Sequence, residues 1–296
     1  MSLFKSNWQY WDELLKRGRL ASLLKDGAPR GIGARLVGFG YPFLLFIIVS
    51  VSVAILFTIP KKKLMWKTMA FSIAAGSVLG WVWGIWMLKA DPVFPGWLFA
   101  PWAVIGKEAI LTIEDWLFYP ACTFMFFVAY RKVELKGQPW VSTPMYITIM
   151  AAYVALTLFF LVFSALAGRT IALMFAVPGM ILFFYARDNI DLRKFLLFQV
   201  IVVGFEVVWD IFAVSLIQFI PGMSWAAQWI YITFDANGAY THSNIFLDYK
   251  THRWAWLLRN PVEITPWFGI VGGLLNYTMF AAGDKLFYGK SLRTPG

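Results

Sequence analysis

About seven apolar stretches, each long enough to cross a lipid bilayer, recur along this chain of 296 residues. A helix needs about 20 residues to cross the hydrocarbon core. The stretches run over about 38–60, 66–88, 109–130, 145–167, 170–186, 195–220 and 261–282. Only helices and closed barrels satisfy backbone hydrogen bonds in lipid, and long runs without polar alternation are helical. We therefore predict an all-α integral membrane protein with about seven transmembrane helices.

The positive charge of the chain lies between these stretches and in the first 37 residues. Only 14% of the residues are charged, and the net charge is +10. The basic clusters outside the spans are Lys61, Lys62 and Lys63; Arg131 and Lys132; Arg187, Arg193 and Lys194; and Lys285, Lys290 and Arg293. This distribution fits anchoring against anionic headgroups and disfavours nucleic acid as a partner. It favours a cytoplasmic position for the C-terminus and for the loops after spans one, three and five, in the cell (inner) membrane.

Residues 1–37 form a separate amphipathic segment. Phe4, Trp8, Trp11 and Leu15 recur with helical spacing, and basic residues follow them. We expect a helix that lies in the membrane interface. Docking of this helix against the bundle or against another subunit is the alternative.

A short acidic motif occurs twice within apolar surroundings. The first copy centres on Glu114 and Asp115, and the second on Glu263. A carboxylate in a membrane span is costly and therefore marks a functional site. Both copies begin a span, four crossings apart, so both enter from the same face. This predicts two parallel three-helix repeats at 38–130 and 170–282, with 145–167 as the connector, in a single membrane domain at 38–296.

The spans and their mouths carry few basic residues to match their acids, which are Glu114, Asp115, Glu206, Asp210 and Glu263. Desolvation and mutual repulsion favour a protonated carboxyl that is able to donate its proton. We predict Glu114, Asp115, Glu263 and Asp210 as catalytic residues. Acceptance of tryptophan N–H bonds is an alternative role for Asp115 and Asp210, and a structural hydrogen bond is an alternative for Glu206.

Aromatic residues gather on the acid-bearing spans and form the predicted substrate-binding set together with Glu206. The aromatic members are Trp81, Trp83, Trp116, Phe118, Trp209, Trp267 and Phe268. Aromatic faces stabilise cations where water is absent. An apolar cavity with a buried acid and aromatic walls suits carbocation chemistry, and the long loop at 221–260 is a candidate lid.

No cofactor or metal is predicted. Gly31, Gly33 and Gly38 do not have the GxGxxG spacing, and no βαβ unit surrounds them. His242 and His252 are ten residues apart, without a recognised metal motif.

The two motifs and the Trp209-Asp210 pair resemble the lycopene cyclase domain family of integral membrane cyclases. The related membrane-bound terpene cyclases have a similar layout of seven spans. The chain departs from the family pattern in Thr112, where the family has proline, and in Ile264, where the family has a second acid. The resemblance implies a cofactor-independent cyclisation, an isomerase or intramolecular lyase reaction of carotenoid or terpenoid biosynthesis.

The expected substrate is therefore a long-chain isoprenoid or carotenoid that enters from the bilayer. Glu114, with Asp115, would protonate an alkene, and Glu263 or Asp210 would accept the final proton. A proton-coupled transporter, an isoprenoid hydratase and a non-catalytic lipid-binding scaffold are the alternatives. Membrane lipids are expected partners. A pathway enzyme or a second copy of the chain is a possible further partner.

Overall fold

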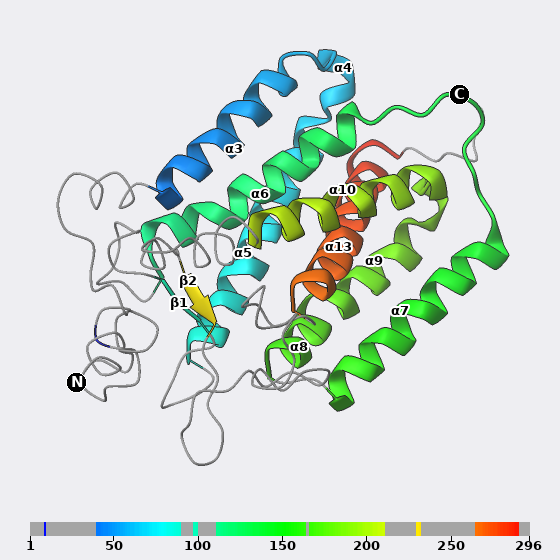
Figure 1. The fold of residues 1–296 in the computed structure, drawn as a ribbon. Coiled ribbons are helices and arrows are strands. Elements are labelled where there is room, and N and C mark those ends of the chain that lie inside the picture. Colours follow the sequence, from blue (N-terminus) through cyan, green and yellow to red (C-terminus); the bar gives the residue numbers. More distant parts are fainter. Residues whose placement is uncertain are drawn as a thin grey trace. The chain divides into compact units, whose positions relative to one another are not determined.

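The structure of the chain is a computed structural model that describes Gln9 and residues 40–89, 97–99, 111–163, 166–210, 229–231 and 264–289. These residues are mainly helical, as predicted (Figure 1). The helices are α3 (Gly40–Leu56), α4 (Lys61–Leu64), α5 (Trp66–Lys89), α6 (Ile113–Lys132), α7 (Thr143–Phe163), α8 (Leu166–Ile171), α9 (Val177–Ala186), α10 (Leu192–Asp210) and α13 (Ile264–Tyr288). A π-helical turn, Ala172–Ala176, joins α8 to α9, and a 3₁₀ turn, Arg187–Asn189, follows α9. Apart from Gln9, the predicted amphipathic segment at 1–37 lies outside the described residues.

Helices occupy the predicted spans within the described ranges. Three of them, Lys61–Trp86, Thr143–Val162 and Arg169–Asn189, are long and apolar enough to cross a membrane, and Leu44–Leu56 is apolar but shorter. Several large apolar side chains point outward, among them Phe184 and Val200. An outward apolar surface on such helices fits a lipid surrounding. The chain thus has the helices of a membrane protein, while the number of seven crossings stays a prediction.

The described residues divide into two compact units whose boundary runs through several helices. The first unit contains 40–47, 81–89, 97–99, 111–118, 207–210, 229–231 and 264–265. The second unit contains 48–80, 119–163, 166–206 and 266–289. Each unit is described by itself below.

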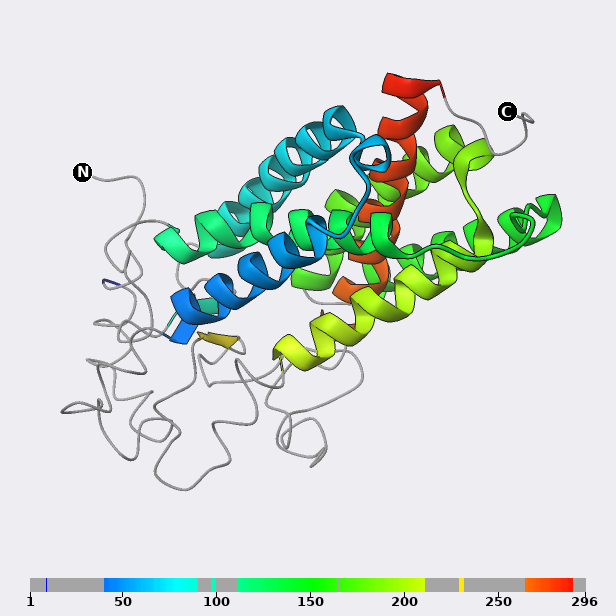
Figure 2. The same cartoon turned by 90° about the horizontal axis from the view of Figure 1, so that it is seen from above.

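In the second unit, α13 packs antiparallel to α10 through glycine (Figure 2). Gly269 lies against Val203 and Gly273 against Gln199, so positions rise along one helix as they fall along the other. A methyl group on Gly269 would lie 3.0 Å from the Val203 Cα atom. The GxxxG spacing places both glycines on one face, where two helix backbones approach closely.

Helices α5 and α6 form a second antiparallel contact with the same spacing. Gly76 faces Thr123, and Gly80 lies directly against the ring of Tyr119. A methyl group on Gly80 would overlap that ring. Glycine is therefore required here by close approach and not by backbone conformation.

Aromatic rings fill the core between α6, α9, α10 and α13. The largest fully buried side chains are Tyr277, Phe127, Phe183, Phe195, Phe198, Phe280 and Leu111. All of them except Leu111 belong to the second unit. Phe127 meets Phe280 edge-to-face at 5.4 Å, and Phe195 meets Tyr277 at 5.3 Å. Edge-to-face pairs add about 0.5–1.5 kcal/mol to the energy of burial, so this cluster fixes the relative positions of the four helices.

In the first unit, two short strands join segments that were predicted as loops. Strand β1 (Trp97–Phe99) pairs antiparallel with β2 (Trp229–Tyr231), with Leu98 opposite Ile230 (Figure 1). Aromatic and β-branched residues favour extended backbone. The loop after α5 and the loop after α10 therefore meet through main-chain hydrogen bonds.

Candidate active site

Thr112 starts α6 and positions the acid pair. Its Oγ1 atom accepts a hydrogen bond from the Asp115 N–H at 3.2 Å, and its carbonyl accepts one from the Trp116 N–H at 3.1 Å. This is an N-cap with an acid three residues later, the pattern of a capping box. Thr112 thus has a local role, because its hydroxyl group caps the start of this helix.

Glu114 and Asp115 are both buried, with 2% of each residue exposed. The neighbouring Ile113 and Leu117 are exposed. The first turn of α6 therefore directs its carboxyls inward and apolar side chains outward, the reverse of a helix in water. The Asp115 Oδ2 atom has no hydrogen-bond partner among the described residues. A buried polar atom without a partner requires an explanation, and a ligand site is one.

Trp81 and Trp116 form an aromatic pair next to these acids. Their ring centroids are 4.9 Å apart, and the Trp81 indole N–H donates to the Trp116 carbonyl at 3.0 Å. This carbonyl needs an outside donor because Pro120, four residues later within α6, has no N–H. Trp81 therefore completes a hydrogen bond that the helix cannot make itself. Trp83 on the same helix is buried, with 7% exposed.

Replacing Trp81 by Phe should therefore destabilise the protein by about 1–3 kcal/mol, since the Trp116 carbonyl loses its donor. The double variant Trp81→Phe, Pro120→Ala should recover most of this loss, because an alanine in place of the proline supplies the helical N–H. Thermal unfolding of the purified protein in detergent measures both effects. An equal loss in the single and the double variant would contradict this explanation.

Phe118 and Trp209 form a second contact in the first unit, with ring centroids 5.1 Å apart. Trp209 is buried and is followed by Asp210, the last residue of α10. This contact places the end of α10 against the first turns of α6. The Asp210 side chain itself lies outside the described part of the structure.

The other predicted site residues do not belong to the described part of the first unit. Glu206 and Phe268 belong to the second unit. There Glu206 is buried against α13 at Gly269, and Phe268 meets Phe175 edge-to-face at 5.4 Å. Glu263 and the side chain of Trp267 lie outside the described residues.

The second unit also contains a buried ion pair, and neither of its residues was among the predicted site residues. The Arg131 guanidinium binds both carboxylate oxygens of Asp284, with Nη1 2.8 Å from Oδ2 and Nη2 on Oδ1. Thr68 donates to Oδ1 at 2.9 Å and Tyr130 to Oδ2 at 3.4 Å. Both charged side chains are about nine-tenths buried. The sequence gives one indication of this pair. Each of the predicted spans 109–130 and 261–282 is followed closely by a charged residue, and both spans end at the same side of the bundle.

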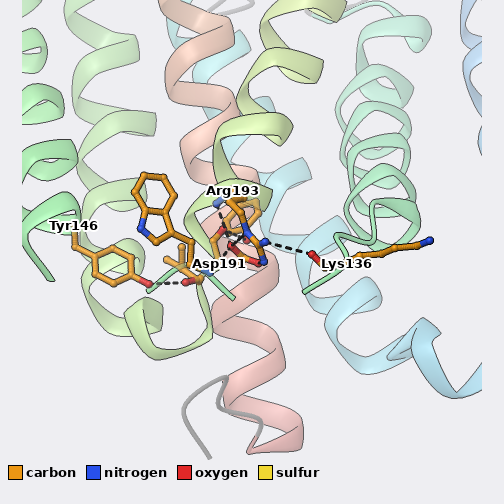
Figure 3. A network of polar contacts seen from close by, with 7 residues as sticks. Lys136, Tyr146, Asp191 and Arg193 are labelled. Atoms are coloured by element: carbon orange, nitrogen blue, oxygen red, sulfur yellow. Dashed lines mark hydrogen bonds and ion pairs between the residues drawn. The ribbon is translucent and has the colours of Figure 1, made fainter. Parts of the chain in front are cut away.

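A polar network lies just before α10. It is at the same end of the second unit as the Arg131–Asp284 ion pair. Asp191 accepts hydrogen bonds from the Arg193 guanidinium and the Trp140 N–H, and Arg193 Nη1 donates to the Lys136 carbonyl (Figure 3). Partial burial by itself would raise the pKa of Asp191, but these hydrogen bonds hold that pKa below its ordinary value. Asp191 is therefore ionised at neutral pH and ties the loop after α6 to the start of α10.

No protein-family model matches this chain, and no curated protein or solved structure is significantly similar to it. Among the described residues, no group of three or more His, Cys, Asp or Glu side chains is placed to hold a metal ion. The candidate site is thus defined by its own geometry, a buried carboxyl pair with aromatic neighbours at the start of α6.

Proposed function

We propose that this chain is an integral membrane cyclase that acts on a long-chain isoprenoid or carotenoid by acid–base catalysis without a cofactor. The observation that carries the proposal is the buried pair Glu114 and Asp115, with the tilted ring contact of Trp81 and Trp116 in the same unit. The helix N-terminus favours an ionised carboxylate by about 0.3–1 kcal/mol. Burial of an ion costs several kcal/mol. The larger effect leaves one carboxyl of the pair protonated and able to donate.

In the proposed reaction this carboxyl protonates a terminal carbon–carbon double bond. The π electrons form the new C–H bond and leave a cation on the adjacent carbon. A second double bond attacks that cation and closes the ring. A carboxylate then removes a neighbouring proton, and the electrons of that C–H bond form the product double bond. The proton is recovered, so substrate and product are isomers and no co-reactant is consumed.

The aromatic contacts support the passage of a cation through this site. Each ring face near a desolvated cation contributes about 2 kcal/mol. Trp116 follows the acid pair directly in the sequence and contacts Trp81, and the Phe118–Trp209 contact brings the end of α10 to the same helix. This second contact supports Asp210 as the acceptor of the final proton, with Glu263 as the other candidate.

The proposed parallel repeats are supported by corresponding features in both halves. Helices α5 and α6 form an antiparallel pair, and so do α10 and α13. The connection within each pair contains one short strand, and these two strands pair with each other. Their sequences, Trp-Leu-Phe and Trp-Ile-Tyr, match in type at each position. We propose that the repeats lie in the cell (inner) membrane, from which the substrate enters.

The test is to incubate the purified full-length protein in lipid nanodiscs with lycopene, squalene and a geranylgeranylated phenol. We expect one substrate to yield a product of unchanged mass and new retention time. A product heavier by the mass of one water molecule would show that the protein is a hydratase and not a cyclase. Recovery of all three substrates unchanged would overturn the proposal for these isoprenoid classes.

A further inference from the structure

One end of the second unit joins four segments that carry many basic residues. The segments are 57–67, 131–140, 185–194 and 284–288. The contacts between them are Lys63 Nζ to Glu134 at 2.7 Å, Arg193 Nη1 to the Lys136 carbonyl at 3.3 Å, Lys285 Nζ to the Tyr185 carbonyl at 2.8 Å and the Lys67 N–H to the Tyr288 hydroxyl at 3.2 Å. We call this set the basic face.

The acids of the basic face are already neutralised. The basic face has eleven basic residues and four acids. The basic residues are Lys61, Lys62, Lys63, Lys67, Arg131, Lys132, Lys136, Arg187, Arg193, Lys194 and Lys285. The acids are Glu134, Asp188, Asp191 and Asp284. Every one of these acids has an ion pair. The described cations of this face without an ion pair are Lys61, Lys62, Lys67, Lys132, Lys136 and Lys194. The basic face thus retains an excess of positive charge.

One of these lysines, Lys194, lies near the buried Arg131. Lys194 Nζ lies 4.0 Å from the centre of the Tyr130 ring, and the Arg131 guanidinium carbon lies 5.0 Å from the same centre. Arg131 uses both terminal nitrogens on Asp284, and its buried Nε atom has no acceptor among the described residues. Lys63, Lys132 and Lys194 all act on Glu134 and hold its pKa below the ordinary value, Lys63 most strongly. Three lysines therefore act electrostatically on one carboxylate, which forms an ion pair with only one of them, Lys63.

The surroundings of Lys132 indicate a lipid. Lys132 Nζ donates to the Thr58 hydroxyl at 2.9 Å, and the adjacent Phe57 is 85% exposed. Trp66, at the start of α5, is also largely exposed. Exposed aromatic side chains at the ends of apolar helices are typical of the membrane interface. Basic residues at this depth attract anionic headgroups.

We propose that Lys132 and Lys194 bind the phosphate of an anionic phospholipid in the adjacent leaflet. The two ammonium groups supply the charge, and Phe57 lies along the glycerol and upper acyl region. Glu134 limits this site because its negative charge acts on both lysines and because it holds the neighbouring Lys63 in an ion pair. The proposal does not depend on the chemistry at the start of α6.

The test is a titration of the full-length protein in detergent with phosphatidylglycerol, followed by native mass spectrometry, with phosphatidylcholine as the neutral lipid. The variant K132Q/K194Q should bind phosphatidylglycerol on the order of 25-fold more weakly, since each interfacial lysine contributes about fivefold. E134Q should bind it several-fold more tightly because Lys63 is released. R169Q, which removes an exposed charge of α8 outside the basic face, should bind as the unaltered protein does.

Three results would overturn the proposal. One is equal phosphatidylglycerol binding by K132Q/K194Q and R169Q. Another is weaker binding by E134Q, which keeps the lysines and so reports on the site even if the lysine variant folds poorly. The third is competition by inorganic phosphate at the concentration of the lipid, which would assign the site to free phosphate.

Discussion

Asp284→Asn should lower the unfolding temperature of the purified protein by on the order of 10 °C, because it leaves the Arg131 guanidinium buried without a counter-ion. Removing one partner of a buried ion pair costs about 3–5 kcal/mol. For a chain of this size each kcal/mol corresponds to about 2–4 °C. Asparagine retains the shape of the side chain and one acceptor for Thr68, so the effect isolates the charge.

Two further variants test this explanation. Asp188→Asn removes a more exposed ion pair, for which the expected loss is below about 1 kcal/mol. The double variant Arg131→Met, Asp284→Leu should recover most of the loss, since apolar replacement of both partners is often neutral. Recovery should be incomplete because the Thr68 and Tyr130 hydroxyls lose their acceptor. A shift in Asp284→Asn no larger than in Asp188→Asn would contradict the importance of the charge.

Glu114→Gln and Asp115→Asn should each reduce product formation by about 10²–10⁴-fold, the contribution of a positioned general acid. Both amides match the shape of a protonated carboxyl, so the unfolding temperature should stay the same or rise. Turnover of the isoprenoid substrate, measured by chromatography with mass detection, reports the activity. Asp188→Asn is the matched control and should keep full activity.

Variants of the proposed acceptors should behave differently from those of the donor. Loss of the donor prevents the first protonation, so only substrate is recovered. Asp210→Asn or Glu263→Gln permits ring closure but impairs removal of the last proton, which should yield double-bond isomers or water adducts. Substantial cyclisation by both Glu114→Gln and Asp115→Asn would falsify the assignment of the acid pair.

The positions of the helices were predictable from the sequence because the bilayer imposes one length on every crossing. Helix α5 at Trp66–Lys89 and α7 at Thr143–Phe163 agree closely with the predicted 66–88 and 145–167. The burial of Glu114 and Asp115 agrees with their prediction as costly internal acids. Their catalytic role stays a prediction.

The contacts between helices were not predictable in the same way. The sequence places Arg131 and Asp284 at span ends on one side of the bundle, but it does not show that these two helix ends are neighbours. Trp81 donates a hydrogen bond to the Trp116 carbonyl because Pro120 leaves this carbonyl without its helical donor. The sequence shows the missing donor but not which side chain of a neighbouring helix replaces it. Trp81 and Trp116 therefore lie together as expected of one site, whereas Glu206 and Phe268 have partners in the other unit.

The glycine contacts between helices bear on the route by which the proposed substrate would enter from the bilayer. Gly80 lies against the Tyr119 ring without room for a methyl group, and a methyl group on Gly269 would lie 3.0 Å from the α10 backbone at Val203. A gate between helices must open by at least the thickness of a hydrocarbon chain. The α5–α6 and α10–α13 seams would lose their tightest packing if they opened, so the substrate that we propose should enter through a seam lined by larger, movable side chains.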